Sequence, residues 1–151
     1  MAAFNKFNIF PEDLASAVHD LSTAGDTLKV ALCDVAPVAT DELLATLTAT
    51  KEIESGGGYT KGTGVTLDSL TLSNSSGVVT ITVADEQITA SGSAIPTFRY
   101  VAVFNSSTAA KTNPLIGWYD YGSNVDLADG ESFTIDFGAN GLVRVGEGTI
   151  A

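Results

Sequence analysis

Cysteine and histidine are almost missing from this chain of 151 residues, since each occurs only once, as Cys33 and His19. One cysteine excludes a disulfide within the chain, and two candidate ligands make a zinc site improbable. A nucleophilic residue with a histidine base would have to use His19, which falls in a predicted helix, and no G-x-S-x-G motif is present. We therefore predict a protein that is not an enzyme, with no catalytic residue, no cofactor and no metal.

Basic residues are also scarce. The chain has 7 Lys and Arg against 18 Asp and Glu, for a net charge of −11. Such a field repels nucleic acid and anionic membranes, so we expect neither as a partner. The first residues lack the apolar stretch of a signal peptide, and no segment approaches the ~20 apolar residues of a membrane helix. We expect a protein that is assembled in a cytoplasm and needs no secretion.

Two patterns that could carry chemistry are incomplete. The glycine-rich segment 54–64 does not have the order of a phosphate-binding loop, because Lys61 precedes Gly62 and a strand follows. It is interpreted as a flexible or interface loop. Acidic residues recur close together at predicted turns and helix starts, and two of them could still meet in space as in a glycosidase. These acids are Asp41, Glu42, Glu52, Glu54, Asp85, Glu86, Asp129 and Glu131.

The N-terminal part of the chain predicts one or two short helices around one strand. Pro11 followed by two acids favours a helix start, and apolar residues at helical spacing extend it over residues 11–22. Residues 27–34 alternate as a strand does, and place Cys33 on the face opposite the leucines and valine as a half-buried filler. A second short helix is predicted through about residue 47, with Thr40, Asp41 and Glu42 at its capped start.

Beyond residue 64 the chain favours strands throughout. The fold class predicted is mainly β: a single-domain β-sandwich or jelly-roll-like barrel with one or two short N-terminal helices. The domain organisation is an N-terminal arm at 1–10, one β-rich domain at 11–146 and a short C-terminal tail at 147–151. A tight turn is predicted at 139–141. The strands are predicted at residues 65–72, 78–84, 87–90, 98–105, 114–122, 132–138 and 142–145.

Aromatic residues concentrate in the C-terminal third of the chain and predict the centre of the core. Strand alternation places three of them on one face of the strand at 98–105 and three apolar residues on one face of the strand at 132–138. Packing is the expected role of both groups. The two groups are Phe98, Tyr100 and Phe104, and Phe133, Ile135 and Phe137.

Several segments together resemble a group of small tailed-phage virion structural proteins. The resemblance covers nearly the whole chain and is weakest at 65–89, and none of its motifs marks a chemical activity. It runs through FNIFPEDLASAVHDL (7–21), DTLKVALCDVAPVAT (26–40), EIESGGGYTKGTG (52–64), ASGSAIPTFRYVAVFN (90–105), NPLIGWYDYG (113–122) and LADGESFTIDFGANGLV (127–143).

The resemblance implies a β-sandwich displayed on the capsid surface of a virion. Within that group, the resemblance implies a capsid decoration (cement) protein. Such a protein is expected to bind the major capsid protein between capsomers as a homo-oligomer, with a trimer as the expected form. A tail or tail-fibre module that binds the host is the alternative, and a carbohydrate-active enzyme is the alternative of another class. Exposed aromatics clustered at 118–121 would favour the tail module.

Five aromatic residues are the candidate interface. Phe4, Phe7 and Phe10 recur at a stride of three in the N-terminal segment, and aromatics near a chain end are typical interface anchors. Trp118 and Tyr119 are added from the strand at 114–122. The alternative role for the three phenylalanines is to cover the open end of the sandwich.

Overall fold

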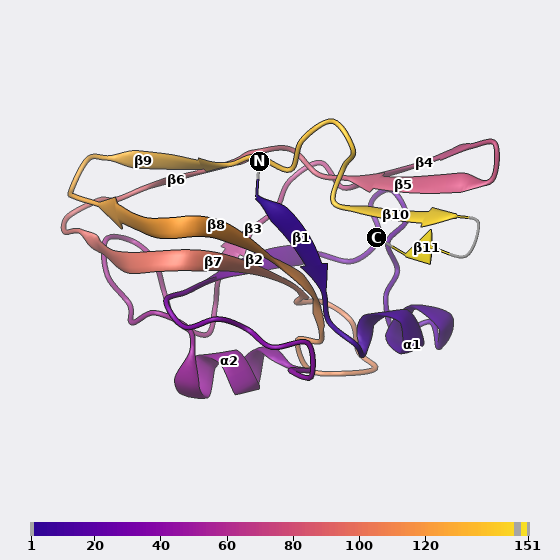
Figure 1. Ribbon diagram of the computed structural model, residues 1–151, viewed down its shortest axis with the longest axis horizontal. Coiled ribbons are helices and arrows are strands. Elements are labelled where there is room, and N and C mark those ends of the chain that lie inside the picture. Colours follow the sequence, from indigo (N-terminus) through magenta and orange to yellow (C-terminus); the bar gives the residue numbers. More distant parts are fainter. Residues whose placement is uncertain (1, 147–148, 151) are drawn as a thin grey trace.

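The computed structural model describes residues 2–146 and 149–150, and in this part of the chain it is mainly β with two short helices (Figure 1). The predicted fold class is therefore confirmed. The helices are α1 (Phe10–Ala15) and α2 (Leu44–Thr50). The strands are β1 (Ala3–Lys6), β2 (Leu28–Cys33), β3 (Val65–Thr66), β4 (Thr71–Ser75), β5 (Val78–Thr82), β6 (Glu86–Thr89), β7 (Ile95–Asn105), β8 (Leu115–Leu127), β9 (Ser132–Ile135), β10 (Val143–Gly146) and β11 (Thr149–Ile150).

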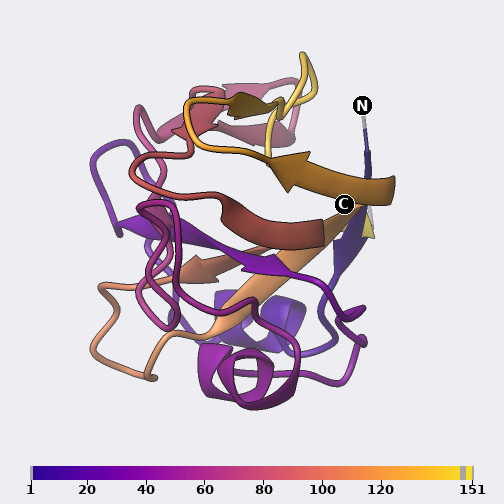
Figure 2. The ribbon, with the colours of Figure 1, turned by 90° about the vertical axis from the view of Figure 1, so that its left-hand side faces the viewer.

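The main sheet has the order β1-β8-β7-β2-β3, and all its pairs are antiparallel. A second layer covers one face and consists of the sheet β11-β10-β5-β4 and the pair β6-β9. Helix α2 lies on the opposite side of the main sheet, as Figures 1 and 2 show. The main sheet is therefore buried on both faces, which explains why β7 and the start of β8 are almost continuously apolar.

Two apolar clusters fill the two faces of the main sheet. The larger cluster lies toward the second layer and includes Val30 and Val101, while the smaller one includes Cys33, Phe104 and α2. Cys33 is thus on the predicted face, but it is fully buried, not half-buried.

The expected shared face of Phe98, Tyr100 and Phe104 is wrong. A register irregularity between Phe98 and Tyr100 shifts the alternation, so Phe98 packs in the larger cluster and the other two in the smaller one. The second predicted group, Phe133 to Phe137, does pack together on the larger cluster.

Both predicted helices differ from those observed. The first ends at Ala15, seven residues early, because Ala17 adopts φ 58° and the Val18 N–H donates back to the Asp13 carbonyl. The second begins at Leu44 and ends at Thr50, three residues beyond the predicted end. The Asp41 carboxylate does not cap it, and instead accepts from the Val38 N–H and pairs with a lysine.

Strand boundaries in the second layer also differ from the prediction. The predicted strand 65–72 is divided between β3, in the main sheet, and β4, in the second layer, with Ser69 at φ 58° between them. The turn at 139–141 exists, with Gly141 at φ 72°, but it joins β9 and β10, which belong to different sheets. Adjacent strands in sequence thus do not form a hairpin there.

The chain ends belong to the sheets. Residues 3–6, predicted as an arm, form β1 and pair with β8, so the segment is part of the domain. Within the predicted tail 147–151, Thr149 and Ile150 form β11 beside β10, and residues 147, 148 and 151 lie outside the described residues.

Candidate binding recess between β1 and β10

The predicted interface aromatics are mostly buried inside the chain. Phe7 and Phe10 have no exposed surface and Tyr119 is 3% exposed, so the expectation that these rings are exposed is wrong. The burial of Phe7 and Phe10 agrees with the alternative role, in which these rings cover the open end of the sandwich. Phe4 and Trp118 are half-buried and remain available to a partner.

Strand pairing arranges four of the five predicted residues in two pairs, one on each face of the main sheet. β1 pairs with β8 so that Phe4 lies opposite Tyr119. The ring centroids are 5.4 Å apart for Phe4 and Tyr119, and 4.6 Å apart for Phe7 and Trp118. Phe10 lies apart from them, against His19 at 5.4 Å.

Gly117 makes room for Phe4. A Cβ added to Gly117 would lie 2.2 Å from Phe4 Cζ and 2.7 Å from the Asn5 carbonyl oxygen. Because only glycine leaves this space, the Phe4 ring can lie against β8 beside Tyr119. An aromatic row continues from there, since Tyr119 and Phe137 meet edge to face at 5.8 Å.

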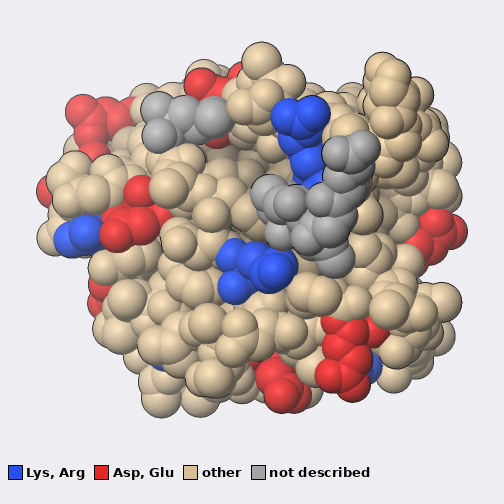
Figure 3. All heavy atoms as spheres, turned by 45° about the vertical axis from the view of Figure 1, so that its right-hand side comes forward, with Lys and Arg blue, Asp and Glu red and all other residues tan. Residues whose placement is uncertain are grey.

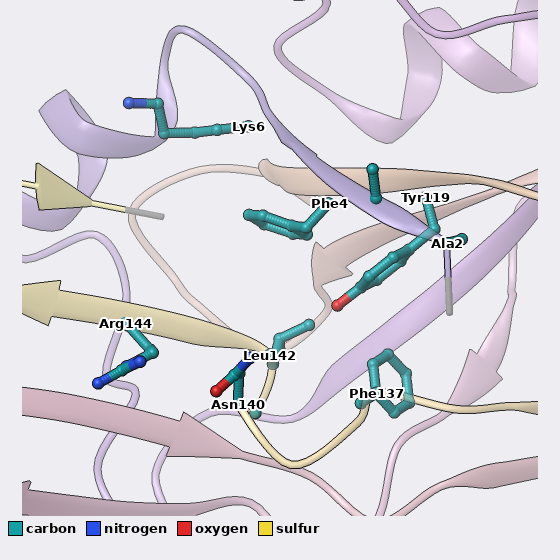
Figure 4. A pocket seen from close by; sticks show the side chains of 10 residues that line it. Ala2, Phe4, Lys6, Tyr119, Phe137, Asn140, Leu142 and Arg144 are labelled. Atoms are coloured by element: carbon teal, nitrogen blue, oxygen red, sulfur yellow. The ribbon is translucent and has the colours of Figure 1, made fainter.

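A recess of about 490 Å³ opens above this row, between β1, β8, the turn at 138–141 and β10 (Figure 4). We call it the β1–β10 recess. Its size falls in the roughly 300–1,000 Å³ of ligand-binding pockets. It is lined by Ala2, Ala3, Phe4, Lys6, Tyr119, Phe137, Asn140, Gly141, Leu142 and Arg144.

Two of the seven basic residues of this acidic chain border the recess. Figure 4 shows the charged ends of Lys6 and Arg144 on the same side of Phe4, away from the Tyr119 hydroxyl. Within residues 2–146 and 149–150, neither forms a salt bridge, whereas Lys51, Lys61, Arg99 and Lys111 do. In Figure 3, most of the acidic side chains in view lie near the outline of the molecule, and some basic side chains lie nearer its middle. The rim of the recess thus carries two cations that form no salt bridge with another described residue.

The Tyr119 hydroxyl adds a neutral donor to the recess. Tyr119 lines the recess, and Figure 4 shows its oxygen directed toward the Leu142 side. Burial raises the pKa of Tyr119 well above its usual range, so the hydroxyl stays protonated near neutral pH. The recess thus combines an apolar floor, one hydroxyl donor and a cationic rim, which suits an apolar group beside a carboxylate.

The sequence analysis missed Lys6, Arg144, Phe137, Asn140 and Leu142 as members of one site. A signal was present for Lys6, which is a rare cation between two phenylalanines in a chain with few cations. No sequence signal connects residue 6 with residue 144, because only the packing of β10 beside β1 brings them to one recess.

Several of the acidic residues considered for catalysis have structural partners. Glu52 is 5% exposed and accepts hydrogen bonds from the Tyr59 hydroxyl at 2.6 Å, from Thr48 Oγ1 at 2.6 Å and from the Gly62 N–H at 2.9 Å. Glu131 accepts from the Ala128 N–H in its own turn, and Asp129 accepts from the Gly92 N–H of a distant turn. Among the described residues, no group of three His, Cys, Asp or Glu side chains could hold a metal ion.

The glycine-rich segment 54–64, predicted as a flexible or interface loop, is anchored to the main sheet by Tyr59. Tyr59 is 4% exposed, donates its hydroxyl to Glu52 and accepts the Leu32 N–H at 3.0 Å. The loop is therefore bound to the main sheet through a buried tyrosine and a buried carboxylate.

A second polar cluster surrounds His19, which lies beyond the end of α1. Asn105 Nδ2 is 3.0 Å from His19 Nδ1 and 2.6 Å from Asp26 Oδ2, and the buried Asp13 carboxylate pairs with Lys111. Burial lowers the pKa of His19, while Asp13 and Asp26 oppose that shift. His19 is 6% exposed, so the cluster is part of the interior and offers no opening to a substrate.

Comparison with known proteins identifies no relative. No family model, curated protein or solved structure matches this chain. None of the helices in the described residues is both long and apolar enough to cross a membrane. The evidence for function therefore comes from the residues and the geometry above.

Proposed function

We propose that this chain is a virion structural protein of a tailed phage, and within that class a capsid decoration protein. It would bind the major capsid protein between capsomers, on the capsid surface, as a homo-oligomer that we expect to be a trimer. The single observation that carries an assembly role is the β1–β10 recess, an apolar, cation-rimmed surface built on paired strands of an otherwise acidic chain.

The physical properties of the chain suit this role. A net charge of −11 keeps the free protein soluble and opposes non-specific association. Once on a lattice, each copy needs a standard interface of roughly 1,200–2,000 Å² to hold its neighbours. Several linked copies then add avidity without new contacts.

Residues 118–121 do not form the exposed aromatic cluster that would favour a tail module. Of the aromatics at 118–121, Tyr119 is buried and Trp118 and Tyr121 are half-buried, so they do not form an exposed sugar-stacking platform. Of the acids considered for a carbohydrate-active enzyme, Glu52 and Asp41 are buried with hydrogen-bond partners, so neither is accessible to a sugar.

The test is the number and position of copies in purified particles, together with binding of the pure protein to shells that lack it. We expect hundreds of copies on the shell and saturable binding. A few copies located at the tail, or binding to host cells and not to shells, would replace the capsid assignment with the tail module. Hydrolysis of a glycan that is lost on one Asp→Ala or Glu→Ala change would contradict both.

A further inference from the structure

The loop between β2 and α2 exposes apolar side chains beside a carboxylate. Among the described residues, three large hydrophobic side chains are exposed, and two of them, Val35 at 48% and Val38 at 49%, lie in this loop. The third is Leu72, on β4. Asp34, also exposed, precedes Val35 directly. The segment 34–38 therefore presents two valines and one acid together.

This segment is held in place although its side chains face solvent. The N–H groups of Asp34 and Val35 donate to the Lys51 carbonyl at 3.2 and 3.5 Å, and the Val38 N–H donates to the Asp41 carboxylate at 2.9 Å. Pro37 is buried between the two valines. Asp41 in turn pairs with Lys51. A loop fixed in this way loses little entropy when a partner covers it.

The exposed loop and the β1–β10 recess have complementary chemistry. The recess offers an apolar floor, the Tyr119 hydroxyl and the two rim cations, while the loop offers valines, backbone carbonyls and a carboxylate. The two surfaces share no residue, so one chain can use both at once, each with a different neighbour.

We propose that segment 34–38 of one copy docks into the β1–β10 recess of a second copy. The valines cover the apolar floor beside Phe4 and Leu142, and the Asp34 carboxylate meets Lys6 and Arg144. The contact is heterologous, so it generates a ring if the rotation between copies closes and a filament if it does not. The inference rests on the proposed assembly function, and it names the contact between copies.

Two single variants break the two sides of this contact. Arg144→Asp reverses a charge on the rim of the recess and leaves the loop intact. Asp34→Arg reverses the charge of the loop and leaves the recess intact. Both side chains are exposed. Sedimentation equilibrium of the full chain should show an oligomer for the wild type and at least tenfold weaker self-association for each variant. Lys61→Asp, which changes a cation outside the recess, is the matched control and should assemble as the wild type does. Circular dichroism checks that each variant folds.

Mixing the two variants is the decisive measurement. Arg144→Asp retains a working loop and Asp34→Arg retains a working recess, and the two reversed charges also attract each other. An equimolar mixture should therefore recover the self-association that neither variant shows alone. Val35→Ser, at a half-exposed position, should weaken self-association without touching charge. A mixture that stays monomeric, or single variants that assemble like the wild type, would overturn the proposal.

The outcome separates this contact from the proposed function. Self-association is measured without shells, and shell binding is measured with the wild type alone. A wild-type oligomer built through this contact that ignores shells would contradict only the capsid assignment. A wild-type protein that binds shells but is monomeric at all concentrations would contradict the contact and the expected homo-oligomer, and would leave the capsid assignment standing.

Discussion

The three phenylalanines of the N-terminal segment lie in two different kinds of environment. Phe7 and Phe10 enter a closed interior, where Phe7 meets Trp118 and Phe10 meets His19. Phe4, three residues earlier, lies on the other face of β8 and forms part of an open recess. In the closed region the cation Lys111 is paired with a buried carboxylate, whereas the cations of the recess have no such partner among the described residues. One segment thus supplies both stability and a surface for assembly.

The largest effect expected is on the closed region. Phe7→Ala removes a fully buried ring that packs between Trp118 and the smaller apolar cluster, and should lower the free energy of unfolding by about 3–5 kcal/mol. Urea denaturation measures it. The matched change Phe4→Ala removes a half-buried ring and should cost less than half as much. Equal losses at the two positions would remove the distinction between the regions.

The next largest loss of stability is expected from a change at Gly117, which lies against Phe4. Gly117→Ala places a methyl group 2.2 Å from Phe4 Cζ, so the ring and the β1 backbone must move, at a cost of about 1–3 kcal/mol. Hydrogen exchange of the β1 amides should then become faster. Gly122→Ala is not a clean control because Gly122 has φ 78°. Gly146→Ala is a better comparison, since a Cβ added to Gly146 would lie 3.0 Å from Val78 Cγ2. Unchanged exchange in β1 would contradict the role of Gly117.

A pH effect is expected from the closed region. Burial lowers the pKa of His19 in the folded state below its unfolded value of 6.5, against the opposing charges of Asp13 and Asp26. Below about pH 6.5 the unfolded chain then binds more protons than the folded protein. The contribution of His19 to the free energy of unfolding is therefore full above that pH and falls as the pH drops, by at most about 1.4 kcal/mol per pH unit. Urea midpoints at pH 7.5 and 5.5 measure it. His19→Gln should flatten this part of the profile, and a wild-type midpoint that rises at pH 5.5 would contradict the sign.

The smallest stability effect is expected at the rim of the recess. Lys6→Ala and Arg144→Ala remove cations that form no salt bridge with a described residue, and should change the free energy of unfolding by no more than about 0.5 kcal/mol. Thermal and urea denaturation measure the change. Lys111→Ala is the contrast, because it leaves the buried Asp13 carboxylate without its cation and should cost more. A large loss at Lys6 or Arg144 would show that the rim is structural.

Local patterns predicted the fold class but not the partners of the strands. Alternating apolar residues made the strands β5 to β10 recognisable, because the two-residue period of a strand is visible in any short window. The end of α1 was missed because it depends on Ala17 adopting φ 58°, a conformation that alanine does not announce in sequence. The face of Phe98 was missed because one irregularity in the β7–β8 ladder reverses the alternation.

The sequence by itself determined the β-rich class, the acidic character, and the scarcity of histidine, cysteine and cations. These are properties of composition and short-range pattern, so they do not depend on how distant segments meet. Only the tertiary structure decided that Phe7 is interior and Phe4 is not, since that depends on β1 pairing with β8 beside Gly117. It also decided that Lys6 and Arg144 border one recess, because two residues 138 positions apart share a site only when β1 and β10 are packed together.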